Sequence, residues 1–141
     1  MSNIKWLVSI AVTSLLYGCI SKKKQDVLTA DFSLGKMKVI KKEKKLDDTI
    51  ELTLMTRYEL KKGISGGLNN YFQYELGNKI KLVINNDTIK PGLSYYVPLI
   101  SEAEKEIDCT YLLQKSDADK IKRIIVDDSI LGFNKINISF K

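Results

Sequence analysis

The chain has 141 residues, a formal net charge of +6 and no histidine. Without histidine, a Ser-His-Asp or Cys-His catalytic arrangement is excluded, and ordinary zinc sites lose their main ligand. Arg57 and Arg123 are the two arginines among 23 basic residues, so the positive charge indicates a solvated lysine-rich surface and disfavours nucleic-acid binding.

A short apolar run lies close to the start of the chain. Residues 6–17 are mostly apolar, follow a single lysine, and lead into the sequence Leu16-Tyr17-Gly18-Cys19. Twelve helical residues span about 18 Å, which is well short of the roughly 30 Å hydrocarbon core of a bilayer. We therefore interpret this run as an export signal rather than a membrane span.

This segment resembles the signal peptides of bacterial lipoproteins, which place leucine, a small residue and the lipid-carrying cysteine where Leu16, Gly18 and Cys19 stand here. The resemblance implies that residues 1–18 are cleaved and that fatty-acid chains are attached at Cys19. It also implies a lipid-anchored protein of the cell envelope. Because Ile20 rather than aspartate follows the cysteine, the resemblance favours the outer membrane. Lysines at 22–24, where some surface lipoproteins carry acidic residues, favour its periplasmic face.

The rest of the chain divides into a tether and one domain. Residues 19–31 begin with a polar, lysine-rich stretch, and we expect the lipidated cysteine and an extended tether there. Residues 32–141 are enough for one domain with a single core. If Cys19 carries lipid, Cys109 has no partner in the chain, and its position on the apolar face of an alternating segment predicts a buried thiol.

From residue 32 onward, apolar and polar residues alternate as in half-buried strands. Residues 49–60 form the longest such segment, and residues 79–85 and 134–141 show the same pattern. Turn-forming residues separate these segments about every ten residues. We therefore predict an all-β fold, an antiparallel two-sheet sandwich with an immunoglobulin-like or transthyretin-like layout.

Three connections carry further expectations. Residues 46–49 and 76–79 are predicted to be hairpin turns, the second one joining a strand at residues 71–76 to the next strand. Residues 116–120 are expected to form a single helical turn.

Two segments are candidates for partner binding. The first is a glycine-rich loop that carries Ile64 and Leu68, and the second is the aromatic segment 93–100 with Tyr95 and Tyr96. For both segments, packing into the core is the competing interpretation, because aromatic and aliphatic side chains usually lie inside a domain.

Three Asp-Ser/Thr-aliphatic triplets resemble the O-glycosylation acceptor sites that one group of Gram-negative bacteria uses on exported proteins. Their hydroxyl residues are Thr49, Thr88 and Ser129. Aspartate followed by a hydroxyl residue is also common where a turn leads into a strand. Modification and turn formation therefore stay open as alternatives.

The sequence favours a binding protein over an enzyme. Its closely spaced carboxylates lie in predicted turns or at strand edges, so we expect no catalytic site, no metal site and no cofactor. We predict a membrane-anchored envelope lipoprotein whose non-catalytic sandwich acts through contacts with a protein partner, in an accessory or assembly role. The alternatives are an immunity or inhibitor lipoprotein directed against a toxin, and a module that binds envelope glycans.

Overall fold

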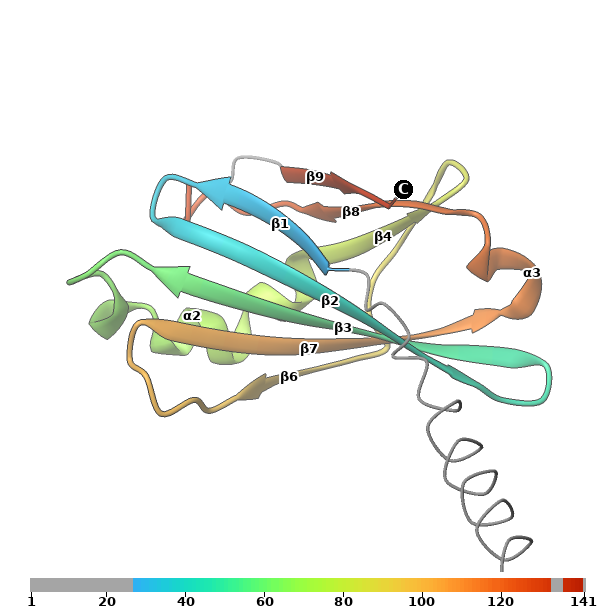
Figure 1. Ribbon diagram of the computed structural model, residues 1–141, viewed down its shortest axis with the longest axis horizontal. Helices are drawn as coiled ribbons and strands as arrows, with labels where there is room; N and C mark the ends of the chain where they lie inside the picture. Colours follow the sequence, from blue (N-terminus) through green and yellow to red (C-terminus); the bar gives the residue numbers. More distant parts are fainter. Residues whose placement is uncertain (1–26, 133–135, 141) are drawn as a thin grey trace, which may run out of the picture.

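The computed structural model describes residues 27–132 and 136–140 (Figure 1). Nine strands in these residues form two antiparallel sheets. The first sheet has the order β1-β2-β3-β7-β6, with β1 at Val27–Phe32, β2 at Gly35–Lys45, β3 at Thr49–Leu60, β7 at Glu104–Gln114 and β6 at Leu93–Val97. The second has the order β5-β4-β8-β9, with β5 at Asp87–Ile89, β4 at Ile80–Ile84, β8 at Ile121–Val126 and β9 at Ile136–Ser139.

Short helical segments connect the strands. The segment between β3 and β4 contains η1 (Ser65–Gly67), α2 (Asn69–Tyr74) and η2 (Leu76–Lys79), and α3 (Lys115–Ala118) follows β7. The expected helical turn near residue 116 is therefore confirmed.

Strand β3 lies in the middle of the first sheet, and it has the half-buried face that its alternation predicts. Its side chains Leu52, Leu54, Thr56 and Tyr58 are fully buried, while the residues that alternate with them point to the outer face. In the second sheet, Leu82, Ile124 and Ile138 lie side by side on three neighbouring strands and are also buried. Side chains from the inner faces of both sheets form one hydrophobic core.

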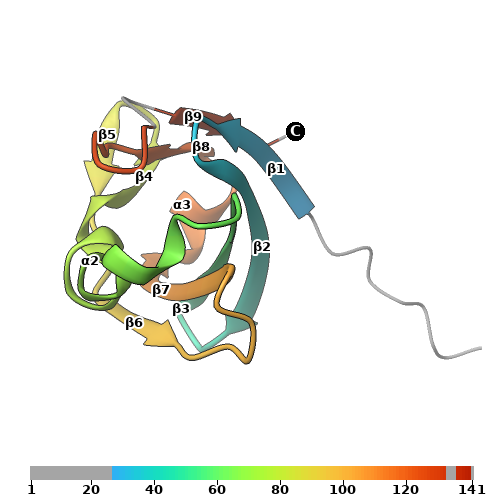
Figure 2. The same ribbon diagram turned by 90° about the vertical axis from the view of Figure 1, so that its left-hand side faces the viewer.

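The first sheet is strongly curved and wraps around the core from β1 to β6 (Figure 2). Its β1 edge lies beside β9 of the second sheet. On the opposite side, α2 and η2 lie between β6 and β4 and fill the space that the two sheets leave there.

The predicted antiparallel two-sheet sandwich is confirmed. Its first sheet starts with three strands that are consecutive in the chain, β1-β2-β3. An immunoglobulin domain instead has the strand order A-B-E-D in one sheet and C-F-G in the other. The strand order of this chain thus differs from that of an immunoglobulin domain, because alternation reports which face is buried and not which strands are neighbours.

The predicted strand at residues 71–76 is wrong, because helix α2 occupies most of it. Leu68, Tyr71, Phe72 and Leu76 recur at helical spacing and all pack into the core. The backbone N–H of Phe72 donates to the carbonyl of Leu68 at 3.0 Å. The adjacent residues Tyr71 and Phe72 are both buried, which a strand with one wet face does not allow.

The sheet begins earlier than the expected domain boundary at residue 32. Strand β1 starts at Val27, and its side chains Leu28 and Ala30 pack against the core. Residues 27–31, expected in the tether, therefore belong to the first sheet. The proposed signal peptide and Cys19 lie outside the described residues.

Candidate functional site at the β6 edge

The outer face of the first sheet carries an acidic row on β7. Because side chains alternate along a strand, Glu104, Glu106 and Asp108 all point to this face. The strand register places Arg57 of β3 opposite Glu106, and Tyr95 of β6 opposite Asp108. Glu106 and Asp108 are both buried. Their cross-strand neighbours differ, because Glu106 faces an arginine and Asp108 faces a tyrosine.

Glu106 is compensated by an arginine. Arg57 donates from Nε at 2.8 Å and from Nη2 at 2.6 Å to the same carboxylate oxygen, Oε2 of Glu106. This hydrogen-bonded ion pair raises the pKa of Arg57. The Glu106 side chain is 6% exposed and Arg57 is 43% exposed, so the arginine covers the carboxylate from solvent.

Asp108 has no such compensation. It is 8% exposed, and its Oδ2 accepts a 3.1 Å hydrogen bond from the Tyr95 hydroxyl. Its other oxygen, Oδ1, is buried and has no hydrogen-bond partner among the residues that the structure describes. Burial raises the pKa of Asp108, and Glu106 adds to this effect, whereas the Tyr95 hydroxyl, Lys42 and Arg57 act against it.

We expect Asp108→Asn to stabilise the fold by about 1 kcal/mol at neutral pH, because a neutral amide avoids the cost of burying a negative charge that has no ion pair. The pKa of Asp108 is higher in the folded than in the unfolded chain. The ionised Asp108 therefore lowers the free energy of unfolding of the parent at pH values above its folded pKa. The cost is lost as the pH falls, so the advantage of the variant disappears below about pH 4.

Urea unfolding of both chains across this pH range measures the effect. Asp31→Asn, a change at an exposed aspartate on the same outer face, is the control and should leave stability unchanged. A stability difference between Asp108→Asn and the parent that is the same at neutral and acidic pH would contradict the prediction.

Exposed apolar side chains surround Asp108 and Tyr95. We define the β6 patch as Tyr74, Leu93, Tyr95 and Leu112, which are 71%, 59%, 49% and 67% exposed. Leu93 and Tyr95 project from β6 on the outer face, and Leu112 continues this face along β7. Tyr74 at the end of α2 lines a narrow crease together with Tyr95 and Tyr96.

The four predicted partner-binding residues therefore have different positions. Tyr95 is exposed in the β6 patch, and Tyr96 is half-buried and packs against the core. Leu68 also packs against the core, and Ile64 is half-buried in the loop before α2. Neither Ile64 nor Leu68 lines the crease that the tyrosines form with α2.

Sequence reasoning missed Asp108 and Tyr74 as members of this site. A signal for Asp108 was present, since alternation places it on the same face as Glu104 and Glu106. Its proximity to Tyr95 depends on pairing between β6 and β7. Tyr74 was assigned to a strand, so its approach to β6 was hidden.

The three candidate O-glycosylation residues lie apart from the β6 patch. Thr88 and Ser129 are exposed, and Thr49 is half-buried at the start of β3. In the third triplet, Asp128 is buried, and its carboxylate accepts hydrogen bonds from the backbone N–H groups of Ile130 and Leu131. The fold thus accounts for Asp128, and modification at this triplet has to be tested with Ser129→Ala rather than by changing the aspartate.

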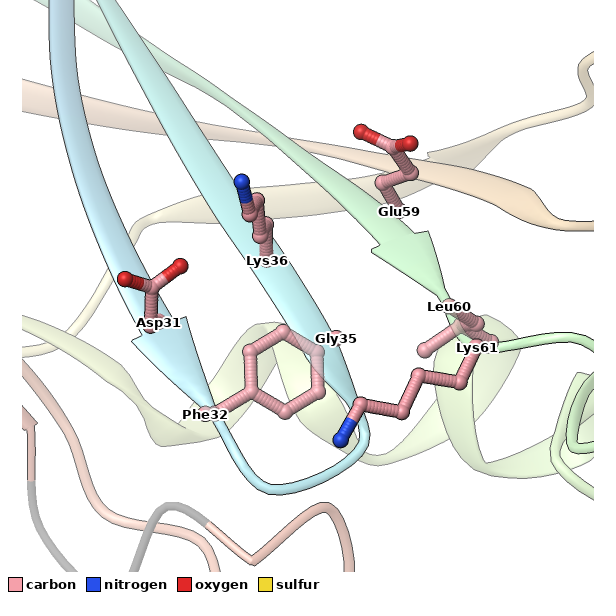
Figure 3. Close-up of a pocket in the computed structure, with 7 residues that line it drawn as sticks. All are labelled: Asp31, Phe32, Gly35, Lys36, Glu59, Leu60 and Lys61. Atoms are coloured by element: carbon pink, nitrogen blue, oxygen red, sulfur yellow. The ribbon is translucent and has the colours of Figure 1, made fainter.

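A second surface feature is a charged depression of about 380 Å³ at the end of β1, β2 and β3 (Figure 3). Asp31, Lys36 and Glu59 rise from its rim, and Lys61 extends over it to donate to the carbonyl of Ser33 at 2.8 Å. An adjoining depression of about 400 Å³ shares these three rim residues. Because acidic and basic side chains alternate around both depressions, this area favours neither an anionic nor a cationic ligand.

The predicted burial of Cys109 is confirmed. The thiol is fully buried, and burial raises its pKa to about 12, so it is a poor nucleophile. Over residues 27–132 and 136–140, no cluster of three or more His, Cys, Asp or Glu side chains is arranged to hold a metal ion. The same residues contain no helix that is long and apolar enough to cross a membrane.

No protein-family model, no curated protein sequence and no solved structure matches this chain.

Proposed function

We propose that this protein is a lipid-anchored component of the cell envelope whose β-sandwich binds a protein partner through the β6 patch in an accessory or assembly role. One observation carries the proposal: large apolar side chains gather, half or more exposed, around an edge strand. Contiguous exposed apolar surface of this kind is typical of interaction sites. The anchor rests on the lipoprotein-like sequence that ends at Cys19.

The geometry of β6 favours a partner that adds a strand. Its residues, Leu93–Val97, include no charged side chain and no proline, which are two of the usual means of protecting a sheet edge. The α2–η2 segment contacts β6 but leaves Leu93 and Tyr95 exposed. The other edge of this sheet, β1, lies beside β9. An extended segment paired with β6 would gain main-chain hydrogen bonds and place alternate side chains against Leu93 and Tyr95.

Asp108 adds a preference for the charge of that segment. A lysine or arginine of the partner near Tyr95 would supply the hydrogen bond and the counter-charge that Asp108 lacks in the described structure. The partner segment is accordingly extended, apolar at alternate positions, and basic at one of them.

Photo-crosslinking in intact cells tests this proposal. A photoreactive phenylalanine analogue in place of Leu93 should give a discrete adduct, and the additional change Tyr95→Asp should reduce its yield at least tenfold. The control is the same analogue at the exposed residue Lys90, which lies outside the β6 patch and should give none. Equal adducts at both positions, or an adduct insensitive to Tyr95→Asp, would contradict the proposal.

Two further measurements complete the test. The Tyr95→Asp chain should unfold at a temperature close to that of the parent, because Tyr95 is half exposed. The lipid anchor is tested by growth with a labelled fatty acid. We expect the native protein to incorporate the label and the Cys19→Ser variant not to, and a native protein without label would contradict the anchor.

A further inference from the structure

Strand β2 presents a row of lysines to solvent. Lys36, Lys38, Lys42 and Lys44 are all exposed on the outer face of the first sheet, and we call them the β2 lysine row. None of the four makes an ion pair with a residue that the structure describes. Lys36 lies beside Asp31 and Glu59, and Lys44 lies opposite Glu51, whereas Lys38 and Lys42 have no acidic cross-strand neighbour. The middle of the row is therefore a strip of positive charge without an ion pair to the described part of the domain.

The cross-strand neighbours of Lys38 and Lys42 strengthen this point. Lys38 lies opposite Arg57, a like-charge pair that destabilises a sheet unless another group compensates it. Arg57 is already engaged with Glu106, and the neighbour of Lys38 on β1 is the uncharged Thr29. Lys42 lies opposite Thr53, which is also uncharged. This arrangement suits an external anionic surface.

The proposed anchor enters the fold next to this row. Val27, the first residue of β1, pairs with Ile40, which lies between Lys38 and Lys42 on β2. The chain from Cys19 to Val27 reaches no more than about 30 Å even when it is fully extended. A lipid on Cys19 would thus keep the β2 lysine row close to the membrane.

We infer that the β2 lysine row lies against the anionic headgroups of the membrane that holds the lipid anchor, an inference that rests on the anchor in the proposed function. Each lysine near such a surface adds electrostatic attraction that falls off within a screening length. Strand β6 is at the other edge of the sheet, and the curvature of the sheet turns its outer face away from that of β2 (Figure 2). A protein seated on this row keeps the β6 patch open to a partner.

Lysine labelling of the native acylated protein tests the inference. The protein is inserted into vesicles of phosphatidylcholine, with or without an equal share of phosphatidylglycerol, and a water-soluble amine reagent is followed site by site by mass spectrometry. We expect labelling of Lys38, Lys42 and Lys44 to be several-fold slower on the anionic vesicles. Labelling of Lys90, which is exposed in the connection between β5 and β6, should be unchanged.

Two further measurements, at high salt and with lysine variants, test whether the protection is electrostatic. Protection should disappear at about 1 M salt, where the screening length is about 3 Å. In the unacylated Cys19→Ser chain, Lys42→Gln with Lys44→Gln should weaken binding to anionic vesicles by about fivefold per lysine, whereas Lys90→Gln should not. Equal labelling on both vesicle types would overturn the inference.

Separate results would refute the lipid anchor and the contact of the β2 lysine row with the headgroups. Native protein that lacks a lipid mass on Cys19 and does not float with vesicles would refute the anchor. Native protein that floats with vesicles but shows no protection of the β2 lysine row would leave the anchor in place and refute the seating.

Discussion

Asp128→Ala is expected to lower the free energy of unfolding by about 3–5 kcal/mol, the range for removing one partner of a buried charged network. The Asp128 side chain is fully buried, and its Oδ1 accepts hydrogen bonds from the Tyr71 hydroxyl and, at 3.1 Å, from the N–H of Ile130. Its Oδ2 accepts from the N–H of Leu131 at 2.8 Å. Alanine would leave these donors without an acceptor in the interior.

The same change would loosen the attachment of the chain after β8 to helix α2. Lys79 approaches Asp128 Oδ1 at 3.8 Å, and its ammonium lies 5.0 Å from the centre of the Tyr71 ring. These contacts tie η2 and α2 to the loop that carries Leu131, a fully buried core residue. The cluster therefore links the two sheets through their helical connection.

Asp127→Ala is the matched control, because the neighbouring aspartate is exposed and makes no side-chain hydrogen bond within the described residues. Guanidinium unfolding should show a change below about 0.5 kcal/mol for this control. Asp128→Ala within about 1 kcal/mol of the parent would show that the buried network is not a major support of the fold.

Gly35→Ala is the second change with a large expected effect, a loss of about 3 kcal/mol or more. A methyl group at residue 35 would lie 2.0 Å from the backbone carbonyl oxygen of Glu59 and 3.1 Å from Cα of Leu60. Backbone atoms cannot rotate away as a flexible side chain can. The start of β2 would have to separate from the end of β3, which overpacks a well-fitted region and disrupts its ladder.

Gly66→Ala provides the control, because a methyl group there meets no atom within 4 Å. Its backbone is not in the left-handed region, so alanine should leave stability unchanged or raise it by about 0.4–1 kcal/mol. Thermal unfolding of the two alanine variants compares a tight backbone contact with open space. Similar melting temperatures would contradict the assigned role of Gly35.

Much of the fold was predictable from alternation. Residues 49–60 were expected as one strand and form β3 with the same bounds, because a half-buried strand repeats every two residues. The turn after β4 was predictable as well, since Asn85 adopts a φ of 55°, a left-handed conformation that asparagine tolerates. Helix α2 was missed because a short apolar run near Tyr71 fits both periods unless Leu68 and Leu76 are counted with it.

The candidate site was only partly predictable. Tyr95 was a candidate for partner binding, with packing into the core as the alternative, and it is exposed. Asp108 lies beside Tyr95, and one of its oxygens is buried and has no hydrogen-bond partner among the described residues. This position depends on the register of β6 against β7. Strand register across a loop is a non-local property, which a single sequence does not encode in any short pattern.

The sequence by itself determined the class of the fold, the buried faces of its strands, the burial of Cys109 and the resemblance that predicts a lipid anchor. These properties follow from the order and polarity of neighbouring residues. Only the tertiary structure decided that the lysines of β2, next to the β1 edge, and the β6 patch lie toward opposite sides of one curved sheet. The reason is physical: which strands become neighbours depends on how the whole core is packed, and that choice sets which exposed side chains act together.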